Sequence, residues 1–150
     1  MSDKIPAQKL VPADPAFAER VRASFDRQGF MRLMGARLVE VAPGRVVIEL
    51  DKLPEVTQQR GQIHGGAIGA IADSAGGYAA MSLTPPGGEV ATVEYKINFM
   101  KPASGALLRA TGEVIRAGRT LTICRIDVAC GDRSAMEPVA VLQATFIAVS

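Results

Sequence analysis

Residues 58–80 contain most of the side chains and backbone groups that could perform chemistry. The only histidine of the chain, His64, is followed by Gly65 and Gly66, and a carboxylate, Asp73, comes nine residues after it. A carboxylate can act as a nucleophile or as a general base. At a helix start, N–H groups without a partner inside the helix attract negative charge. The N–H of Gly65 could therefore hold a carbonyl oxygen on which negative charge develops.

The same residues are expected to form a helix from residue 64 to residue 83, because Pro85 and Pro86 end it. One side of this helix is apolar and would face a sheet; it consists of Ile68, Ile71, Ala72, Ala75 and Ala79. The residues that share the face of Asp73 are all small, namely Gly66, Gly69, Ala70, Gly76, Gly77 and Ala80.

Each glycine costs a helix roughly 1 kcal/mol relative to alanine. The small face must therefore gain from close approach by another backbone, a partner helix or a ligand. Tight packing alone, with Asp73 merely solvated at the edge of an interface, accounts for the spacing as well as a catalytic role does.

The separation of His64 and Asp73 bears on where a site could lie. Nine residues of helix place the two side chains about 13 Å apart along the axis and about 180° apart around it. One helix cannot present both to the same small reacting group. If both serve one site, that site lies between two copies of the helix, which predicts an obligate dimer with two equivalent sites.

The remaining elements predict an α+β fold. The expected order is a loose leader, a helix at about 15–28 with Asp14 as N-cap and Gly29 as its stop, strands at 31–41 and 45–50, a connection at 51–63, the helix at 64–83, and strands at 89–100, 106–116, 120–130 and 139–149. One long helix with many strands indicates a helix lying on a curved antiparallel sheet.

Composition sets further bounds. A chain of 150 residues with 48% apolar and 21% charged residues is expected to form one globular domain, and a net charge of +2 does not favour a nucleic-acid partner. No secretory signal or membrane span is evident, which indicates a cytoplasmic protein. Cys124 and Cys130 are about 20 Å apart on one strand, so both are expected to be reduced and buried. A zinc site that combines them with His64 would be strained, so we expect no metal.

Beyond these patterns, the chain resembles a known family. The pattern Gln58-x-x-Gly61-x-x-His64-Gly65-Gly66, followed by Asp73, is similar to that of hotdog-fold acyl-CoA thioesterases, particularly the phenylacetate-pathway (PaaI-like) and 4-hydroxybenzoyl-CoA types. Residues 92–103, with the run Asn-Phe-Met-Lys-Pro, look like the strand that follows the helix in that family, and residues 118–121 look like its next hairpin turn. The likeness covers about residues 30–149.

The resemblance implies a fold, an assembly and an activity. The fold would be a long helix wrapped by a curved antiparallel sheet of about five to six strands. The minimal unit would be a homodimer, and pairs of dimers, that is homotetramers, are usual in the family. The activity would be hydrolysis of an aryl- or medium-chain acyl-CoA to the free acid and CoA, without a cofactor.

The resemblance also implies a role for each motif residue. Asp73 would be the nucleophile or the general base for water, and the Gly65 N–H would polarise the thioester carbonyl. Gln58 would contact the nucleophilic water or the carboxylate, and Thr92 would help to place that water. His64 would form a hydrogen bond near the thioester and orient the loop. Asp73 and Thr92 would come from one subunit, and the other three residues from its partner.

Each of these residues also has a plain structural interpretation. A lone histidine before a helix often only caps it, Gln58 could be ordinary loop polarity, and Thr92 suits any strand. Lys101, Arg116 and Arg119 lie near turns and, with Gly66 at the helix start, could bind the phosphates of coenzyme A. Each of the three cations could equally be an ordinary solvent-exposed residue at the rim of the protein.

The motif departs from its relatives in one respect. Some relatives carry Glu at the position of Asp73 and some carry Asn at that of Gln58, so the pairing of Gln with Asp leaves the choice between aryl and alkyl groups open.

Other functions remain compatible with parts of the sequence. A non-catalytic acyl-CoA-binding dimer, acting as a sensor or scaffold, could share the fold, although the intact set of Gln58, Gly65 and Asp73 argues against it. A hotdog dehydratase or hydratase would need its histidine and carboxylate in one pocket, and relatives of that kind carry a proline-rich loop where this chain has Gly65-Gly66. A small structural domain whose glycine face only packs is the last alternative.

Overall fold

The protein is described by a computed structural model over residues 8–149, so the first seven residues of the predicted leader lie outside the described part. The elements follow in the order α1 (Phe17–Asp26), α2 (Gly29–Met34), β1 (Arg37–Ala42), β2 (Arg45–Asp51), the 3-10 turn η1 (Pro54–Val56), α3 (Gly65–Met81), β3 (Glu89–Phe99), β4 (Leu107–Ala117), β5 (Leu121–Asp132) and β6 (Ala135–Val149). Two short helices therefore precede the first strand, where the sequence predicted one.

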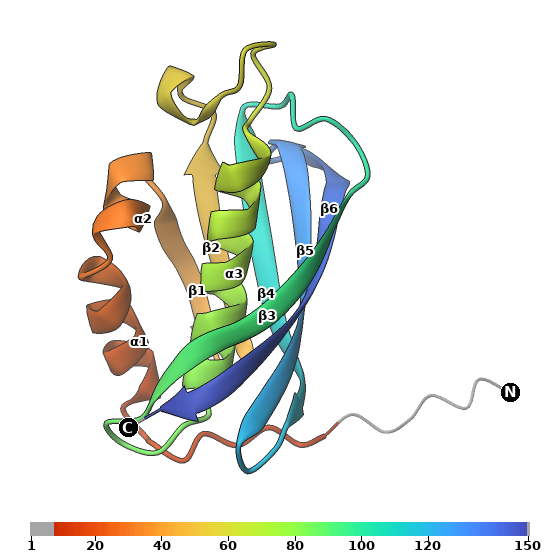
Figure 1. Cartoon of the computed structure of the whole chain (residues 1–150). Helices are drawn as coiled ribbons and strands as arrows, with labels where there is room; N and C mark the ends of the chain where they lie inside the picture. The colour runs from red at the N-terminus through yellow and green to blue at the C-terminus, as the bar shows by residue number, and fades with distance from the viewer. Residues whose placement is uncertain (1–7, 150) are drawn as a thin grey trace, which may run out of the picture.

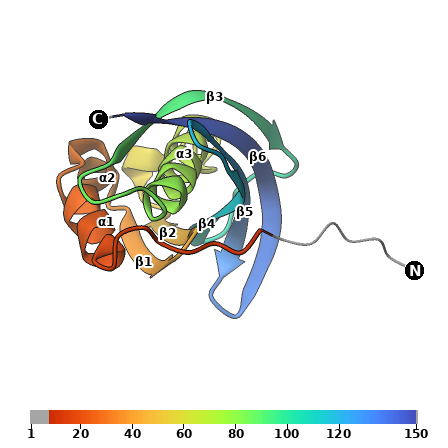
Figure 2. The ribbon, with the colours of Figure 1, turned by 90° about the horizontal axis from the view of Figure 1, so that it is seen from below.

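All six strands form one antiparallel sheet with the order β1-β2-β4-β5-β6-β3. The sheet curves around α3, which lies in its concave side, and the view along the helix shows the strands enclosing it (Figures 1 and 2). The side of α3 predicted to face the sheet is buried at Ile68, Ile71, Ala72, Ala75 and Ala79. The predicted α+β hotdog architecture is confirmed.

The close approach of α3 to the sheet depends on glycines. A Cβ at Gly112 on β4 would lie 2.5 Å from the carbonyl carbon and oxygen of Ala75, which is closer than any real contact. On the helix itself, a Cβ at Gly76 would lie 2.9 Å from Ile126 and 3.0 Å from Phe146. Part of the small face around Asp73 therefore packs against the protein's own sheet, and the glycines there are not all reserved for a partner or a ligand.

We expect Gly112→Ala to lower the free energy of unfolding by roughly 2–4 kcal/mol, because the backbone atoms of Ala75 can yield only if the whole helix shifts. Gly29→Ala is the matched control, since the nearest atom to a Cβ there is 3.9 Å away. Urea denaturation of both variants measures the effect. Equal stability of the two would show that α3 is not seated as tightly as the structure indicates.

The predicted strand at 31–41 is wrong in its first half. Residues 29–34 form α2, which buries Met31 and Met34 three residues apart on one face. Gly35 ends the helix in a left-handed conformation (φ 74°), and Gly35 and Ala36 donate hydrogen bonds back to Arg32 and Met31. Gly29, predicted as a helix stop, also begins the next helix.

The last strand also differs, because β6 begins at Ala135 and not at residue 139. Gly131, Asp132 and Ser134 indicated a turn, but the turn is shorter than these residues suggest. Pro138 is accommodated at a register irregularity where it pairs with Ala129.

The described part of the leader is held in place and is not loose. The side-chain amide of Gln8 exchanges hydrogen bonds with the backbone of Ala117, at 3.2 and 2.9 Å. Asp14 accepts a hydrogen bond from the N–H of Ala16, and α1 begins at Phe17, two residues later than the sequence predicted. Arg20 bonds Asp14 at 2.8 Å and the carbonyl oxygen of Gly88 at 2.6 Å, which fixes α1 against the loop between α3 and β3.

Both cysteines are buried and unbridged, as predicted, and burial raises the pKa of the Cys124 thiol to about 12, so this thiol is unreactive. Within residues 8–149, none of the helices combines the length and the apolar character needed to cross a membrane.

Candidate active site

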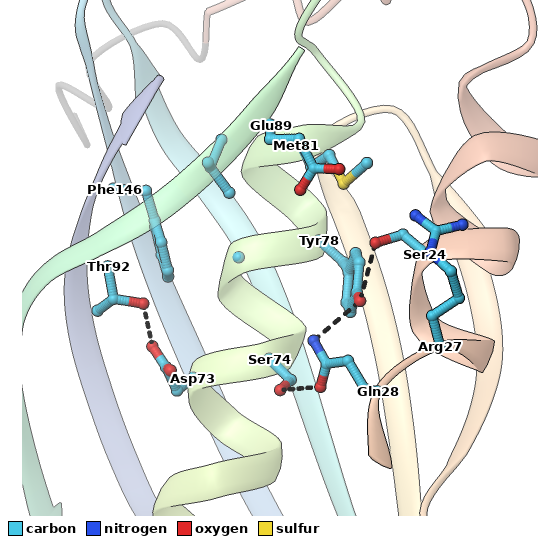
Figure 3. Close-up of a pocket in the computed structure, with 12 residues that line it drawn as sticks. Ser24, Arg27, Gln28, Asp73, Ser74, Tyr78, Met81, Glu89, Thr92 and Phe146 are labelled. Carbon is cyan, nitrogen blue, oxygen red and sulfur yellow. Dashed lines mark hydrogen bonds between the residues drawn. The ribbon is translucent and has the colours of Figure 1, made fainter. Parts of the chain in front are cut away.

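Asp73 extends from the middle of α3 toward β3, the edge strand that crosses the helix. Thr92 on β3 donates a hydrogen bond of 2.9 Å to its Oδ1 atom (Figure 3). The carboxylate is partly buried, and burial raises its pKa, while the Thr92 hydroxyl acts in the opposite direction. No lysine or arginine among the described residues forms a salt bridge with it. A partly buried carboxylate without a cation is costly and is typical of a functional site.

Asp73 and Thr92 form part of the wall of a cavity of about 430 Å³. Its other walls come from α1 and the start of α2, from later turns of α3, and from β3 and β6; the remaining lining residues are Ser24, Arg27, Gln28, Ser74, Gly77, Tyr78, Met81, Glu89, Val90 and Phe146. Figure 3 shows the polar ends of Ser24, Gln28, Ser74 and Tyr78 meeting between α1 and α3.

Sequence reasoning missed this polar wall. The sequence did contain one indication of it, because Ser74 and Tyr78 lie one helical turn apart on the helix that carries Asp73 and so share a face. Gln28 could not be connected to them, because fifty residues separate it from Tyr78.

The start of α3 is capped by His64. Its Nδ1 atom accepts a hydrogen bond of 2.8 Å from the N–H of Gly66, so the ring proton lies on Nε2 in this arrangement. The capping interpretation of His64 therefore holds, and the N–H of Gly66 is already occupied. His64 and Gly66 line a cavity of about 430 Å³ with apolar residues of α2, Phe30 and Leu33 among them.

The N–H of Gly65 is differently placed. Among the described residues, none accepts a hydrogen bond from it. Gly65 lines a separate cavity of about 350 Å³ together with Gln58, Phe99 and Lys101. A Cβ at Gly65 would lie 3.2 Å from the ring of Phe99. This N–H is available to polarise a carbonyl oxygen.

The side chain of Gln58 is engaged within its own loop. Its amide nitrogen donates to Gln62 Oε1 at 2.9 Å, and its amide oxygen accepts a hydrogen bond from the N–H of Arg60. Gln58 therefore orders the turn that leads to His64, which is the loop-polarity interpretation of this residue. It still lines the same cavity as Gly65.

Within one chain, the predicted catalytic residues fall into three groups. Asp73 and Thr92 line one cavity, and Gln58 and Gly65 line a second. His64 directly precedes Gly65, but it lines a third cavity. This agrees with the helix geometry that separated His64 from Asp73 in the sequence.

The predicted phosphate-binding cations do not gather either. Lys101 forms a salt bridge of 3.0 Å with Glu137, and it borders the cavity of Gly65. Lys101 precedes the first residue of β4, whereas Arg116 lies near its last residue, so about 30 Å of strand separates the two. Arg119 follows in the turn after β4. Both arginines are exposed, and neither lines the three cavities.

Known proteins are similar to this chain in both sequence and fold. Residues 60–137 match the family described as the thioesterase superfamily. A thioesterase family protein from Silicibacter pomeroyi has a solved structure with 38% identity and a TM-score of 0.86, over 89% of this chain and 98% of that one. Human acyl-coenzyme A thioesterase 13 is 30% identical over 112 residues, which are 73% of this chain and 79% of the human protein.

The fold is also that of the PaaI protein from the phenylacetic acid degradation operon of E. coli. The TM-score is 0.80 at 18% identity, over 89% of this chain and 94% of that one.

Proposed function

Because this chain belongs to the thioesterase superfamily, we propose that it hydrolyses an acyl-CoA thioester to the free acid and CoA, with Asp73 as the catalytic carboxylate. The observation that carries the proposal is the environment of this carboxylate. It is partly buried, has no cationic partner among residues 8–149, accepts a hydrogen bond from Thr92 and faces a cavity large enough for an acyl group. Such a group can attack a carbonyl carbon or take a proton from water.

The proposed site needs a second copy of the chain. Among residues 8–149, the eleven-residue edge strand β3 pairs with β6 and with no other strand, and it exposes Val93, Tyr95 and Phe99. A long apolar edge strand of this kind favours pairing with another chain. We propose that two copies join through their β3 strands around a two-fold axis.

The positions of the two half-sites on α3 support this arrangement. Gly69 lies midway between Gly65 and Asp73, four residues from each, and the hydroxyl of Tyr95, near the middle of β3, lies against it. An antiparallel pair of α3 helices that cross at Gly69 would therefore bring Gly65 of one subunit opposite Asp73 of the other. A single two-fold axis that passes near Tyr95 of β3 and Gly69 of α3 would therefore relate the two chains and form two equivalent sites.

In such a site, the Gly65 N–H donates a hydrogen bond to the thioester oxygen and stabilises the negative charge that develops there, while Asp73 lies on the opposite side of the carbonyl carbon. As a general base, Asp73 takes a proton from water while the water oxygen adds to the carbonyl carbon. The tetrahedral intermediate then expels the CoA thiolate, which takes the proton from Asp73 and restores the carboxylate. As a nucleophile, an oxygen of Asp73 attacks the carbonyl carbon and displaces the CoA thiolate, which forms a mixed anhydride between Asp73 and the acyl group. Water then hydrolyses this anhydride, releasing the free acid and Asp73. In both routes the hydroxyl of Thr92 holds Oδ1 and leaves Oδ2 to react.

Release of free CoA from a panel of thioesters tests the function. The panel contains arylacetyl, benzoyl and short- to long-chain alkyl thioesters of CoA, and we expect saturable turnover of at least one. Saturable binding with no turnover of any substrate would identify the chain as an acyl-CoA-binding dimer and would contradict the proposed hydrolysis.

The dependence of kcat/KM on pH should show the raised pKa of Asp73. Only the ionised carboxylate can react, so activity should fall as pH drops through a pKa above the ordinary aspartate value of about 3.9. In Thr92→Val the hydroxyl that lowers this pKa is lost, and the acid limb should move to higher pH. An acid limb that stays in place or moves to lower pH in this variant would mean that another group controls it.

A further inference from the structure

The outer, convex face of the sheet carries a buried carboxylate on β2. Ile48 and Leu50 are fully buried in the core, so Glu49 between them points to the opposite face of the sheet, away from α3 and the candidate active site. Carboxylates are almost never fully buried unless they are paired. Glu49 is nevertheless only 1% exposed, because three arginine side chains cover it.

These arginines, which we call the arginine cluster, come from distant parts of the chain. Arg37 on β1 and Arg109 on β4 are the direct cross-strand neighbours of Glu49, and Arg133 lies in the turn between β5 and β6. Oε1 of Glu49 accepts hydrogen bonds from Nε and Nη2 of Arg109, at 3.0 and 2.6 Å, and from Nη1 of Arg133, at 3.1 Å. Oε2 lies 2.8 Å from Nη2 of Arg133 and 3.7 Å from Nη2 of Arg37. One carboxylate therefore orients three guanidinium groups.

The arginine cluster carries more positive charge than its own carboxylates neutralise. Within residues 8–149, the one other carboxylate paired with it is Asp51, which accepts two hydrogen bonds from Arg37. Three cations and two anions leave a net charge of +1. A buried ion pair contributes little net stability, because the cost of removing its charges from water offsets their attraction. Stability alone therefore does not explain why three arginines gather on one glutamate.

Part of the donor capacity of the cluster is free and accessible. In the part of the chain that the structure describes, no acceptor binds Nε of Arg37, Nη1 of Arg109 or Nε of Arg133. The three side chains are 41%, 33% and 65% exposed, so a ligand in solution can reach them. Guanidinium groups match phosphate oxygens in both charge and geometry. Because Glu49 already orders the cluster, little side-chain freedom would be lost when a phosphate binds.

We propose that the arginine cluster on the convex face of the sheet is a binding site for a phosphate-bearing anion, separate from the cavity of Asp73. A free inorganic phosphate or diphosphate and a phosphorylated small molecule share the required chemistry. The proposal does not depend on hydrolysis at Asp73, because α3 and its carboxylate lie on the concave side of the sheet (Figure 1).

Binding of inorganic diphosphate, measured by isothermal titration calorimetry, tests the proposal. We expect saturable binding to the wild-type protein. In Arg133→Gln the affinity should fall roughly 10- to 100-fold, because one guanidinium is lost while Arg109 keeps its bonds to Glu49. An absence of binding to the wild type would overturn the proposal.

Arg125→Gln is the matched control. Arg125 is also an exposed, carboxylate-paired arginine of the convex face, and its side chain is 58% exposed, so its replacement changes the net charge equally. It should leave the affinity for diphosphate unchanged, and equal losses in the two variants would contradict a site at the cluster. If Arg133→Gln fails to fold, Arg37→Gln replaces it, and an unchanged affinity in that variant would be equally contradictory.

Competition identifies the source of the phosphate. Displacement of bound diphosphate by an equal concentration of free CoA would assign the site to the phosphates of CoA, and retention of diphosphate would assign it to a smaller anion. Either result supports a phosphate site at the arginine cluster.

Discussion

Replacing Asp73 with asparagine is expected to lower kcat for acyl-CoA hydrolysis by roughly 10²- to 10⁴-fold. The amide oxygen can still accept the hydrogen bond from Thr92, so the geometry is retained, but an amide can neither take a proton from water nor attack a carbonyl carbon. Steady-state release of CoA measures the loss. Unchanged turnover would show that Asp73 is not the catalytic carboxylate.

The same variant should keep its stability. The folded protein retains the Asp73 proton to a higher pH than the unfolded chain does, so this group contributes less stability as pH rises through the raised pKa. At neutral pH the ionised carboxylate is therefore a cost, and Asp73→Asn should be at least as stable as the wild type in urea denaturation. An inactive variant that is also clearly less stable would indicate a structural role for the carboxylate instead.

Removing the N–H of Gly65 should lower kcat by roughly 10²- to 10³-fold. Gly65→Pro achieves this with little change to the helix, because proline is favoured at the first helical position. His64 already has the extended backbone that a residue before proline requires, with φ −64° and ψ 137°.

Gly65→Ala is the matched control for this variant. It places a Cβ against the same Phe99 ring but keeps the N–H, and Phe99 is 54% exposed and can move. We expect the alanine variant to retain most of its turnover. Equal losses in the two variants would assign the effect to steric contact with Phe99 and not to the N–H group.

Local patterns in the sequence predicted much of the fold. Alternation and turn residues indicated all six strands, and the apolar stripe of α3 indicated the side that meets the sheet. The same rules missed α2, because Gly29 was interpreted only as a stop and Gly35 was not recognised as the end of a second short helix. The placement of β3 beside β6 at the edge of the sheet depends on contacts between distant segments, which local patterns do not contain.

The site was predicted in part for a similar reason. Helix geometry separated His64 from Asp73, and resemblance to a family paired Asp73 with Thr92. The glycines at 76 and 112 show their purpose only when helix and sheet are in contact. The polar wall of Gln28 and Tyr78 forms only when α1 packs on α3.

The central claim is that each catalytic site combines Asp73 of one chain with Gly65 of another. Equal amounts of Asp73→Asn and Gly65→Pro, unfolded together and refolded to exchange subunits, test this claim directly. Each parent alone lacks one half of every site. After random pairing, about a quarter of the sites would join an intact Asp73 to an intact Gly65 from the partner, so we predict about a quarter of the wild-type activity. Activity that remains at the level of the separately refolded parents would contradict a site shared between two chains.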